Sequence, residues 1–275
     1  MLYLIATPIG NLEDITLRAL RLLKECDLIL CEDTRHSLIL LKHYEIQKPL
    51  KSFHKFNEAS QEDEILASMA EGMKVALISD AGTPGISDPG SRLVQKCVEK
   101  GIQVFSIPGA CAAIAALTCS GLATDLFQFC GFLPRKNQEL KKHLQQLLSY
   151  KGTSICYESP HRLLNLLKTL HELAPKRLVV VARELTKKFE EVCRGMPQEL
   201  LQHWQDRVIK GEIVLMIQGE AEGESQKWET LTPVEHVQFL ENQLNITRKE
   251  AIKLAADLRG ISKRDLYREC LPPQD

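Results

Sequence analysis

The sequence predicts an α/β protein with two α/β domains, a mostly parallel sheet in the N-terminal domain, a mixed sheet in the second, and a small helical C-terminal extension. Short apolar runs of strand type alternate with helical stretches through the first half of the chain, which is typical of a parallel sheet. Two strand-like runs near residues 180 and 192 have no helix between them, which favours a hairpin. Beyond a polar, acidic stretch at Gly219–Glu229 the pattern is helical only.

The N-terminal domain, residues 1–118, is expected to hold a series of parallel strands, and their carboxyl ends then share one edge of the sheet. Its strands are expected at Leu2–Ala6, Leu28–Cys31, Leu50–Phe53, Val75–Ile78 and Val104–Ile107. Its helices are expected at Ile15–Glu25, Ser37–Tyr44, Gly90–Lys100 and Ala110–Leu122.

The same apolar patterns predict the strands and helices of the second domain, residues 119–220, and the helices of the extension, residues 221–275. Strands are expected at Phe127–Phe132, Thr153–Tyr157, Leu178–Ala182, Glu190–Arg194 and Ile213–Ile217. Helices are expected at Glu139–Leu148 and at Pro160–Leu173, the latter with Ser159 as N-cap. Three short helices, broken at Asn245 and Gly260, are expected at Pro233–Leu244, Arg248–Leu258 and Lys263–Cys270.

Composition excludes several classes of protein. The 275 residues are 44% hydrophobic and 26% charged with a net charge of −1, so any polyanion site must be a local patch. The nine cysteines form no CxxC pair, and the eight histidines form no HxxxH or HExxH pattern, so no metal site is expected. No signal peptide is recognisable and no apolar run approaches the roughly 18 residues of a membrane span, so we expect a cytoplasmic protein.

The strongest candidate for a binding site is the loop Ser79–Gly90, which is rich in glycine and proline and follows a buried strand. Open α/β sheets bind ligands at the carboxyl ends of strands, where glycine lets the backbone approach a ligand and proline fixes its path. A plain turn with Asp88 as N-cap and Pro89 as first helical residue is the alternative, but a turn needs far fewer than these roughly ten residues. The loop therefore indicates a ligand.

Two further loops, Thr7–Asn11 (TPIGN) and Pro108–Ala112 (PGACA), follow strands of the same predicted sheet. Neither GxGxxG after the first strand nor GxxxxGK[ST] occurs, so a bound phosphate is not expected. Two polar clusters, Glu32–His36 (EDTRH) and His54–Glu58 (HKFNE), follow the strands at Leu28–Cys31 and Leu50–Phe53. We expect all of them at one edge of the sheet.

Six motifs in this order, TPIGNLEDIT, EDTRHS, SDAGTPGISDPG, FCGFLPRK, YESPHRL and ARELTKKFEE, resemble the tetrapyrrole methylase superfamily. Within it they are similar to the branch that methylates the ribose 2′-oxygen of a decoding-centre cytidine in 16S ribosomal RNA. The resemblance covers residues 1–220, and Thr247–Tyr267 is similar to the small helical extension of that branch. One departure is the third loop, PGACA, where relatives often carry PGPSA.

The resemblance implies a tetrapyrrole-methylase-like fold, S-adenosyl-L-methionine as cofactor in a cleft between the two domains, the small ribosomal subunit as partner, and a homodimer. The implied cofactor residues of the first domain are Pro8, Gly10, Asp80, Ala81, Gly82, Thr83, Pro84, Ser87, Pro108, Gly109, Cys111 and Ala112. Those of the second domain, around the adenine, are Phe132, Leu133, Ala182, Arg183, Glu184, Gly211 and Glu212.

A ribose hydroxyl is a weak acid, so methyl transfer to it needs alignment and a base or a cation near the developing alkoxide. We expect Asp33 or His54 to accept the proton, and Arg35 and Asn57 to position the nucleotide. Alternatively, Glu32 and Asp33 cap the next helix and pair with Arg35.

Arg162 is a further catalytic candidate, although its role has two interpretations. It reaches a phosphate or the cofactor carboxylate, or it pairs with Glu158 or Glu184. Three basic stretches are candidate RNA contacts, although surface lysines often serve only solubility. They are Arg135–Lys142, Lys176–Lys188 and Arg248–Glu269, and for the last a role in dimer packing is equally open. The alternative functions are methylation of a tetrapyrrole or another small metabolite, and a non-catalytic ribosome-assembly factor.

Overall fold

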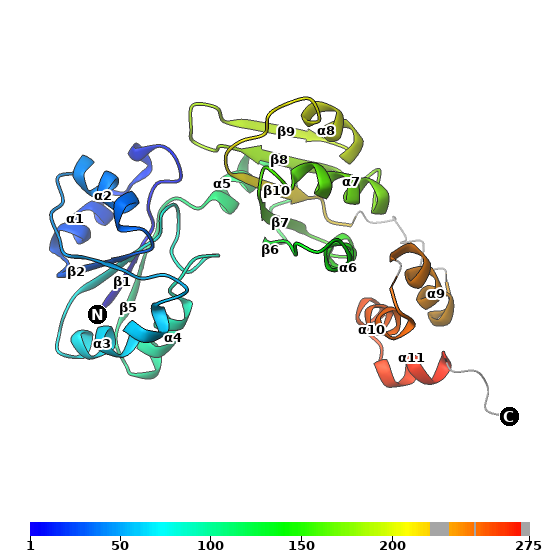
Figure 1. Ribbon diagram of the computed structural model, residues 1–275, viewed down its shortest axis with the longest axis horizontal. Helices are drawn as coiled ribbons and strands as arrows, with labels where there is room; N and C mark the ends of the chain where they lie inside the picture. Colours follow the sequence, from blue (N-terminus) through cyan, green and yellow to red (C-terminus); the bar gives the residue numbers. More distant parts are fainter. Residues whose placement is uncertain (221–230, 245, 271–275) are drawn as a thin grey trace. The chain divides into compact units, whose positions relative to one another are not determined.

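The computed structural model describes residues 1–220, 231–244 and 246–270 (Figure 1). The chain divides into two compact units, Met1–Ala116 with Arg183–Glu191, and Leu117–Ala182 with Val192–Asp275. The segment Arg183–Glu191 thus belongs to the first unit, although it lies inside the second predicted domain. Asn245 and residues 221–229 of the predicted linker lie outside the described residues. No helix in the described part of the chain is long and apolar enough to cross a membrane.

The first unit is built on a five-stranded sheet in the order β3-β2-β4-β1-β5. Its strands are β1 (Leu2–Ile5), β2 (Leu28–Cys31), β3 (Leu50–Ser52), β4 (Val75–Ile78) and β5 (Val104–Ile107). Every pair of neighbours is parallel; Leu2 of β1, for example, lies opposite both Val75 and Val104. The predicted strands are confirmed to within one residue, and all five carboxyl ends meet at one edge of the sheet.

Helices cover both faces of this sheet (Figure 1). They are α1 (Leu17–Glu25), α2 (Thr34–His43), α3 (Glu58–Ala70) and α4 (Ser91–Glu99), with α5 (Ala112–Ser120) following β5. The apolar sides of α1 and α2 pack on one face, around Leu23 and Leu41, and those of α3 and α4 pack on the other, around Leu66 and Leu93. This gives a three-layer α/β/α unit.

Gly90 caps α4 with a φ of 122°, in a region that favours glycine, and α4 begins at Ser91. The alternative cap at Asp88 with Pro89 as first helical residue was therefore wrong. A side chain at Gly90 would also clash with Leu77, because its Cβ would lie 2.5 Å from Leu77 Cδ2. The loop thus continues to Gly90, as expected for a ligand loop and not for a short turn.

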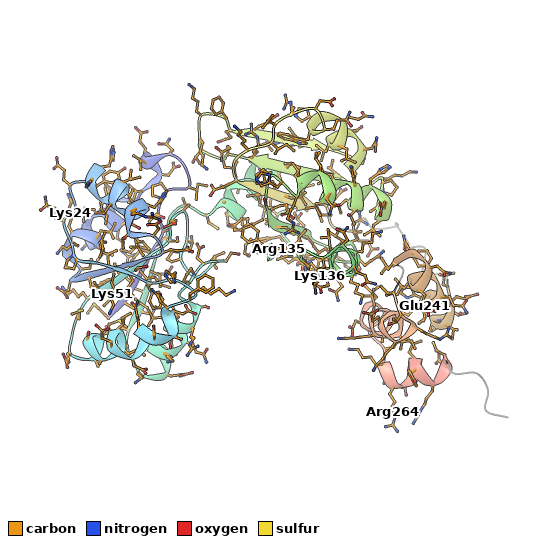
Figure 2. All side chains as sticks on the ribbon, viewed as in Figure 1. Lys24, Lys51, Arg135, Lys136, Glu241 and Arg264 are labelled. Carbon is orange, nitrogen blue, oxygen red and sulfur yellow. The ribbon has the colours of Figure 1, made fainter. Side chains whose placement is uncertain are left out.

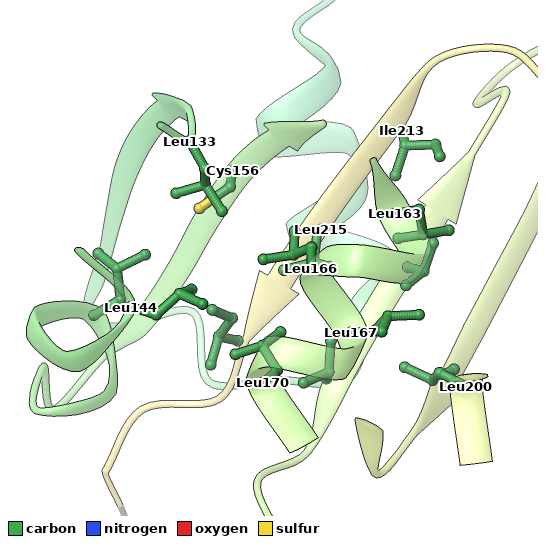
Figure 3. Close-up of a cluster of buried hydrophobic side chains, with 14 of the residues drawn as sticks. Leu133, Leu144, Cys156, Leu163, Leu166, Leu167, Leu170, Leu200, Ile213 and Leu215 are labelled. Atoms are coloured by element: carbon green, nitrogen blue, oxygen red, sulfur yellow. The ribbon is translucent and has the colours of Figure 1, made fainter. Parts of the chain in front are cut away.

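The second unit holds a mixed sheet in the order β6-β7-β10-β8-β9. Its strands are β6 (Phe127–Phe132), β7 (Thr153–Glu158), β8 (Val179–Arg183), β9 (Glu191–Gly195) and β10 (Ile213–Ile217). β7 pairs parallel with β6 and antiparallel with β10, which confirms the predicted mixed sheet. The helices α6 (Asn137–Leu148), α7 (Leu163–Leu173) and α8 (Pro197–Trp204) pack on it through Leu144, Leu166 and Leu200 (Figure 3).

The start of α7 differs from the prediction. The helix begins at Leu163, with Arg162 as N-cap, whereas Ser159 and Pro160 were expected there. The reason is the buried Glu158, whose carboxylate accepts the Ser159 N–H at 2.7 Å, while the Arg162 N–H donates to the Ser159 carbonyl at 3.0 Å. These bonds close a turn over residues 159–162 before the helix can start.

The C-terminal extension consists of α9 (Pro233–Leu244), α10 (Arg248–Arg259) and α11 (Lys263–Glu269), which share an apolar core around Leu240, Ala255 and Leu266. The three predicted helices are confirmed to within one residue. Gly260 ends α10 in the left-handed conformation, with a φ of 65°, as its predicted role as a break requires.

We expect acid to destabilise this helical extension through His236. Its side chain is fully buried, and burial next to Arg259, whose Nε lies 3.0 Å from Nδ1, lowers the pKa of His236 to about 4. In the unfolded chain the pKa of a histidine is near 6.5. The free energy of unfolding of the extension is therefore highest above that pH, and it falls as the pH drops from 6.5 towards 4. The loss amounts to about 3 kcal/mol.

Thermal melts of the wild type and of His236→Gln, followed by circular dichroism at pH 7.5 and pH 4.5, measure this effect. The melting temperature of the wild-type extension should fall with acid more steeply than that of the variant. Equal acid sensitivity in both would show that His236 is not the titrating group.

Candidate functional site

Polar groups and loops gather at the carboxyl edge of the first sheet. Because every strand runs parallel, the segments after β1 to β5 all emerge there. The strand order separates them into two sets. The polar clusters follow β3 and β2 on one side, whereas the three glycine- and proline-containing loops follow β4, β1 and β5 on the other. The two sets meet where β2 lies beside β4.

The three loops are tied together by backbone and hydroxyl hydrogen bonds. Thr7 and Gly82 exchange two backbone hydrogen bonds, at 2.9 and 3.0 Å, and the Thr7 hydroxyl donates to the Ser79 carbonyl at 3.1 Å. The Thr83 hydroxyl donates to the Ala110 carbonyl, also at 3.1 Å. Gly82 itself adopts a φ of 82°, which favours glycine. The loops therefore form one preorganised arrangement.

The predicted cofactor residues of the first unit lie in or beside these three loops, and they differ from one another in solvent exposure. Pro8, Gly82 and Pro84 are buried within them. The remaining ones are half-buried or exposed, and they are Gly10, Asp80, Ala81, Thr83, Ser87, Pro108, Gly109, Cys111 and Ala112. The structure thus brings together all twelve residues that the resemblance assigned to the first domain.

The segment Arg183–Glu191 packs against the first of these loops. The Asn11 N–H donates to the Thr186 hydroxyl at 3.1 Å, and a side chain at Gly10 would clash with Thr186. The predicted cofactor residues Arg183 and Glu184 both form ion pairs inside this segment, with Glu191 at 3.2 Å and Lys187 at 2.8 Å respectively.

The other predicted cofactor residues belong to the second unit. Phe132, at the end of β6, is 61% exposed, and its ring meets Tyr157 edge-on at a centroid distance of 5.7 Å. Leu133 and Ala182 have buried side chains, so they can offer a ligand only backbone atoms. Gly211, with a φ of 90°, and Glu212 precede β10. That both sets serve one cofactor stays a prediction.

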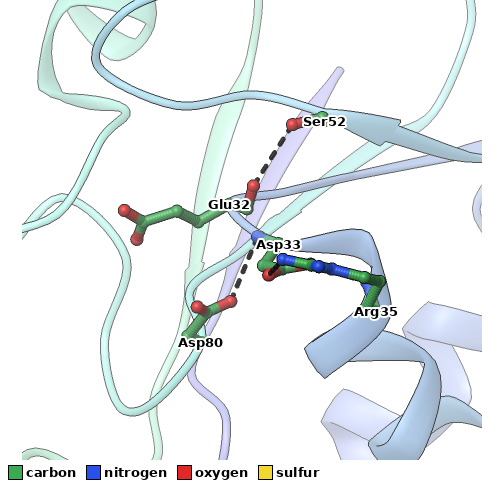
Figure 4. A network of polar contacts seen from close by, with 5 residues as sticks. All are labelled: Glu32, Asp33, Arg35, Ser52 and Asp80. Carbon is green, nitrogen blue, oxygen red and sulfur yellow. Dashed lines mark hydrogen bonds and ion pairs between the residues drawn. The ribbon is translucent and has the colours of Figure 1, made fainter.

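Hydrogen bonds link the segment after β2 to β3 and to the segment after β4, at the sheet edge where Glu32, Asp33 and Asp80 lie (Figure 4). Asp80, after β4, accepts the Asp33 N–H at 3.2 Å, and the Ser52 hydroxyl of β3 donates to the Glu32 carbonyl at 3.2 Å. The half-buried Glu32 carboxylate points away from Arg35 (Figure 4). Burial, together with the neighbouring charge of Asp80, raises the pKa of Glu32 above its ordinary value. Glu32 and its neighbour Asp33 therefore differ in how readily they bind a proton.

Asp33 has a different environment. Its carboxylate caps α2 by accepting the Arg35 N–H at 2.8 Å, and it also accepts two hydrogen bonds from the Arg35 guanidinium, at 3.1 and 2.7 Å. These bonds lower the pKa of Asp33 to about 2. The alternative in which Glu32 and Asp33 cap the helix and pair with Arg35 is therefore confirmed for Asp33 and wrong for Glu32. A carboxylate of such low pKa is a weak proton acceptor.

Hydrogen bonds of the His54 and Asn57 side chains close the loop that follows β3. The His54 Nδ1 accepts the Phe56 N–H at 3.3 Å, so the neutral imidazole carries its proton on Nε2 and presents a donor there. The Asn57 side chain accepts the His54 N–H at 2.8 Å and donates to the Ser52 carbonyl at 3.1 Å. Asn57 therefore holds the loop in place with its side chain.

Arg162 lies in the second unit, where its guanidinium forms an ion pair and two hydrogen bonds. It pairs with the buried Glu158 at 3.3 Å and donates to the carbonyls of Leu133 at 3.1 Å and Pro134 at 2.6 Å. Of the two interpretations left open, the structure therefore shows pairing with Glu158. These contacts fix the chain where β6 ends, at Phe132.

The basic stretches differ in how their charges are used. In Arg135–Lys142, three lysines form ion pairs, among them Lys142 with Glu250 of α10 at 2.6 Å. On the extension, the exposed side chains of Lys249, Lys253, Arg264 and Arg268 carry charge outward, as Figure 2 shows for Arg264. Of these two stretches, the extension therefore exposes more cationic side chains to a polyanion. In the third stretch, Lys176–Lys188, Lys187 forms an ion pair with Glu184.

Close relatives match nearly the whole chain. The ribosomal RNA small subunit methyltransferase I of Halalkalibacterium halodurans is 47% identical over 270 residues, which are 97% of this chain and 93% of that protein. The protein of the same name from Bacillus subtilis is 44% identical over 271 residues, again 97% of this chain and 92% of that protein.

Among solved structures, uroporphyrin-III C-methyl transferase from Thermus thermophilus, complexed with S-adenosyl homocysteine, has the same fold. Its TM-score is 0.56 at 20% identity, over 78% of this chain and 96% of that one. The sequence profile of the tetrapyrrole (corrin/porphyrin) methylases matches residues 1–201. A profile match over most of the chain, with relatives above 40% identity along nearly all of it, shows that the chain belongs to the tetrapyrrole methylase family.

Proposed function

We propose that this protein transfers the methyl group of S-adenosyl-L-methionine to the ribose 2′-oxygen of a cytidine in the decoding centre of 16S ribosomal RNA. The names of the relatives support ribosomal RNA as the substrate. The observation that carries the proposal is that the three glycine- and proline-containing loops meet the polar clusters at one edge of the sheet. There Asp80, in the loop after β4, accepts the backbone N–H of Asp33, in the cluster after β2. We assign the loops to the methyl donor and the polar clusters to the acceptor.

The residues of the three loops fit the cofactor. S-adenosyl-L-methionine has a sulfonium and an ammonium group, and the half-buried carboxylates of Asp80 and Glu32 supply negative charge beside the loops. The loops lack a phosphate-binding pattern, and Gly82 gives the loop a backbone conformation that favours glycine. When bound, the cofactor supplies an electrophilic methyl group.

Within this proposal, Glu32 replaces Asp33 and His54 as proton acceptor. With S-adenosyl-L-methionine bound, its sulfonium would supply the methyl group to the ribose oxygen and keep the electron pair of the broken carbon–sulfur bond, and the Glu32 carboxylate would accept the hydroxyl proton. Asp33 is too weak a base with a pKa of about 2, and the His54 Nε2 presents a proton. His54 then donates a hydrogen bond to the nucleotide. Arg35 and Asn57 position the nucleotide through the two polar loops that they hold in place.

The substrate is tested by transfer of labelled methyl from S-adenosyl-L-methionine. Purified small subunits lacking the modification should accept label at a ribose, located by mass spectrometry of nuclease digests. Label on a precorrin and none on small subunits would favour a metabolite methylase. Absence of cofactor binding in calorimetry would favour a non-catalytic ribosome-assembly factor. A homodimer and a reaction without a metal ion are further parts of the proposal, tested by light scattering and by activity in chelator.

We expect Gly82→Ala to weaken cofactor binding about tenfold. Its φ of 82° strains any other residue, and the new Cβ would lie 3.3 Å from Ile9 Cγ2, so the Ile9 side chain in the neighbouring loop must also move by a few tenths of an ångström. Such strain costs on the order of 1–3 kcal/mol, and 1.4 kcal/mol is tenfold in Kd. The matched control is Gly101→Ala, whose φ of 68° is also strained but whose surroundings are open. Calorimetry should find weaker binding only for Gly82→Ala, and equal Kd values for both variants would contradict the loop assignment.

A further inference from the structure

Phe56, in the loop between β3 and α3, is the most exposed large hydrophobic side chain among the described residues, at 94%. A phenylalanine so exposed gains almost nothing from the hydrophobic effect on folding. Single exposed apolar residues are common on proteins, so exposure alone decides nothing. What sets Phe56 apart is that hydrogen bonds tie its loop to Ser52 and, through Ser52, to Glu32.

The loop that carries Phe56 is closed by hydrogen bonds. The Phe56 N–H donates to His54 Nδ1 at 3.3 Å, and the two rings meet edge-on at a centroid distance of 6.0 Å. Asn57 bonds to His54 and to the Ser52 carbonyl, and the Ser52 hydroxyl bonds to the Glu32 carbonyl. These bonds fix the backbone at Phe56 beside the Glu32 segment, and the Phe56 ring projects from it into solvent.

We propose that Phe56 stacks on an unpaired base of the substrate RNA, at the target nucleotide or next to it. Proteins that recognise RNA by sequence or position take unstacked bases of single strands on aromatic side chains. Exposed Lys55 adds positive charge for the adjacent phosphate, and the Nε2–H of His54 adds a donor on the same loop. The proposal rests on the proposed function, since it requires RNA as substrate.

Steady-state kinetics with purified small subunits tests the stacking. Loss of one base stack should raise the KM for small subunits roughly 5- to 150-fold in Phe56→Ala. Phe56→Trp should stay close to the wild type, because it retains a stacking face, whereas Phe56→Leu should resemble Phe56→Ala, because it is apolar but cannot stack. The Kd for S-adenosyl-L-methionine should not change in any of them.

Val98→Ala is the matched control. Val98 is 67% exposed near the end of α4, which leads to the opposite edge of the sheet, so it removes exposed apolar surface away from the site. Wild-type kinetics in Phe56→Ala, or in Phe56→Leu, would overturn the stacking proposal while leaving RNA methylation intact. A wild-type enzyme that transfers no methyl group to small subunits would instead overturn the proposed function.

Discussion

Glu32→Gln should lower kcat for methyl transfer by about a hundred- to ten-thousand-fold, the range that general-base catalysis contributes. The change keeps the size and the hydrogen-bonding backbone of Glu32, whose carbonyl accepts from Ser52 Oγ at 3.2 Å, but it removes the group that accepts the proton. The cofactor Kd should change much less than kcat. Single-turnover rates with saturating S-adenosyl-L-methionine and small subunits measure the effect.

The pH profile separates a base from a merely structural carboxylate. A base works only when deprotonated, so wild-type kcat should fall as the pH drops through the raised pKa of Glu32. That acid limb should be absent from the residual activity of Glu32→Gln. Asp33→Asn is the matched control: an amide oxygen can still cap α2, so kcat should stay within tenfold of the wild type. A larger loss in Asp33→Asn than in Glu32→Gln would return the role of base to Asp33.

Arg162→Ala should destabilise the second unit by about 3 kcal/mol. The variant leaves the fully buried Glu158 carboxylate without its cation, and breaking such a pair typically costs 3–5 kcal/mol. The lower end applies because the Arg162 side chain is 25% exposed. The bonds to the carbonyls of Leu133 and Pro134 are lost as well. Urea denaturation, followed by the tryptophan fluorescence of a Trp228→Phe background in which Trp204 of α8 is the remaining tryptophan, measures the change.

The pH dependence of this loss has a definite sign. Burial already raises the pKa of Glu158, and a carboxyl with a raised pKa destabilises the fold above its ordinary pKa. This cost is relieved as the pH falls through the raised value. Without Arg162 the pKa of Glu158 should rise further, so the stability gap between variant and wild type should narrow from pH 8 to pH 5.

Lys136→Ala is a matched control for Arg162→Ala, since it removes an exposed ion pair with Glu139 in the same unit and should cost under about 0.5 kcal/mol. A normal stability of Arg162→Ala together with lost turnover would mean that Arg162 acts on the substrate or the cofactor, as one interpretation of the sequence held.

Periodicity predicted the strands well because each is a short apolar run between polar turns; β2 and β4 have the predicted bounds. The helix α3 was not predicted. Its buried face includes the charged Glu62, which pairs with Arg92 at 2.7 Å and with Lys96, and a charged residue on the core side interrupts the apolar stripe that marks a helix. The short helix α8 was missed as well, with only eight residues to show a period.

The sheet edge that carries the candidate residues could be located from the sequence, but the roles of these residues could not be assigned. Gly/Pro-rich loops and polar clusters after strands indicate an edge, and a parallel sheet brings them together. Which carboxylate is basic depends on contacts that only the fold supplies. Asp33 and Glu32 are neighbours in sequence, yet an arginine holds the pKa of the first low, whereas burial beside Asp80 raises that of the second.

The position of β4 between β2 and β1 has a consequence for how such enzymes diversify. In the proposed function, residues 32–58 form the acceptor side and follow β2 and β3 at one border of the sheet, whereas the three loops proposed to bind the methyl donor follow the other three strands. Under the proposed function, mutations in β3 and in the loop after it can therefore change the acceptor side with little effect on the three donor loops, whereas changes near Asp33 reach those loops through its hydrogen bond to Asp80. A family whose name refers to corrins and porphyrins, and whose relatives here are named for ribosomal RNA, is what such a division of labour within one sheet would allow.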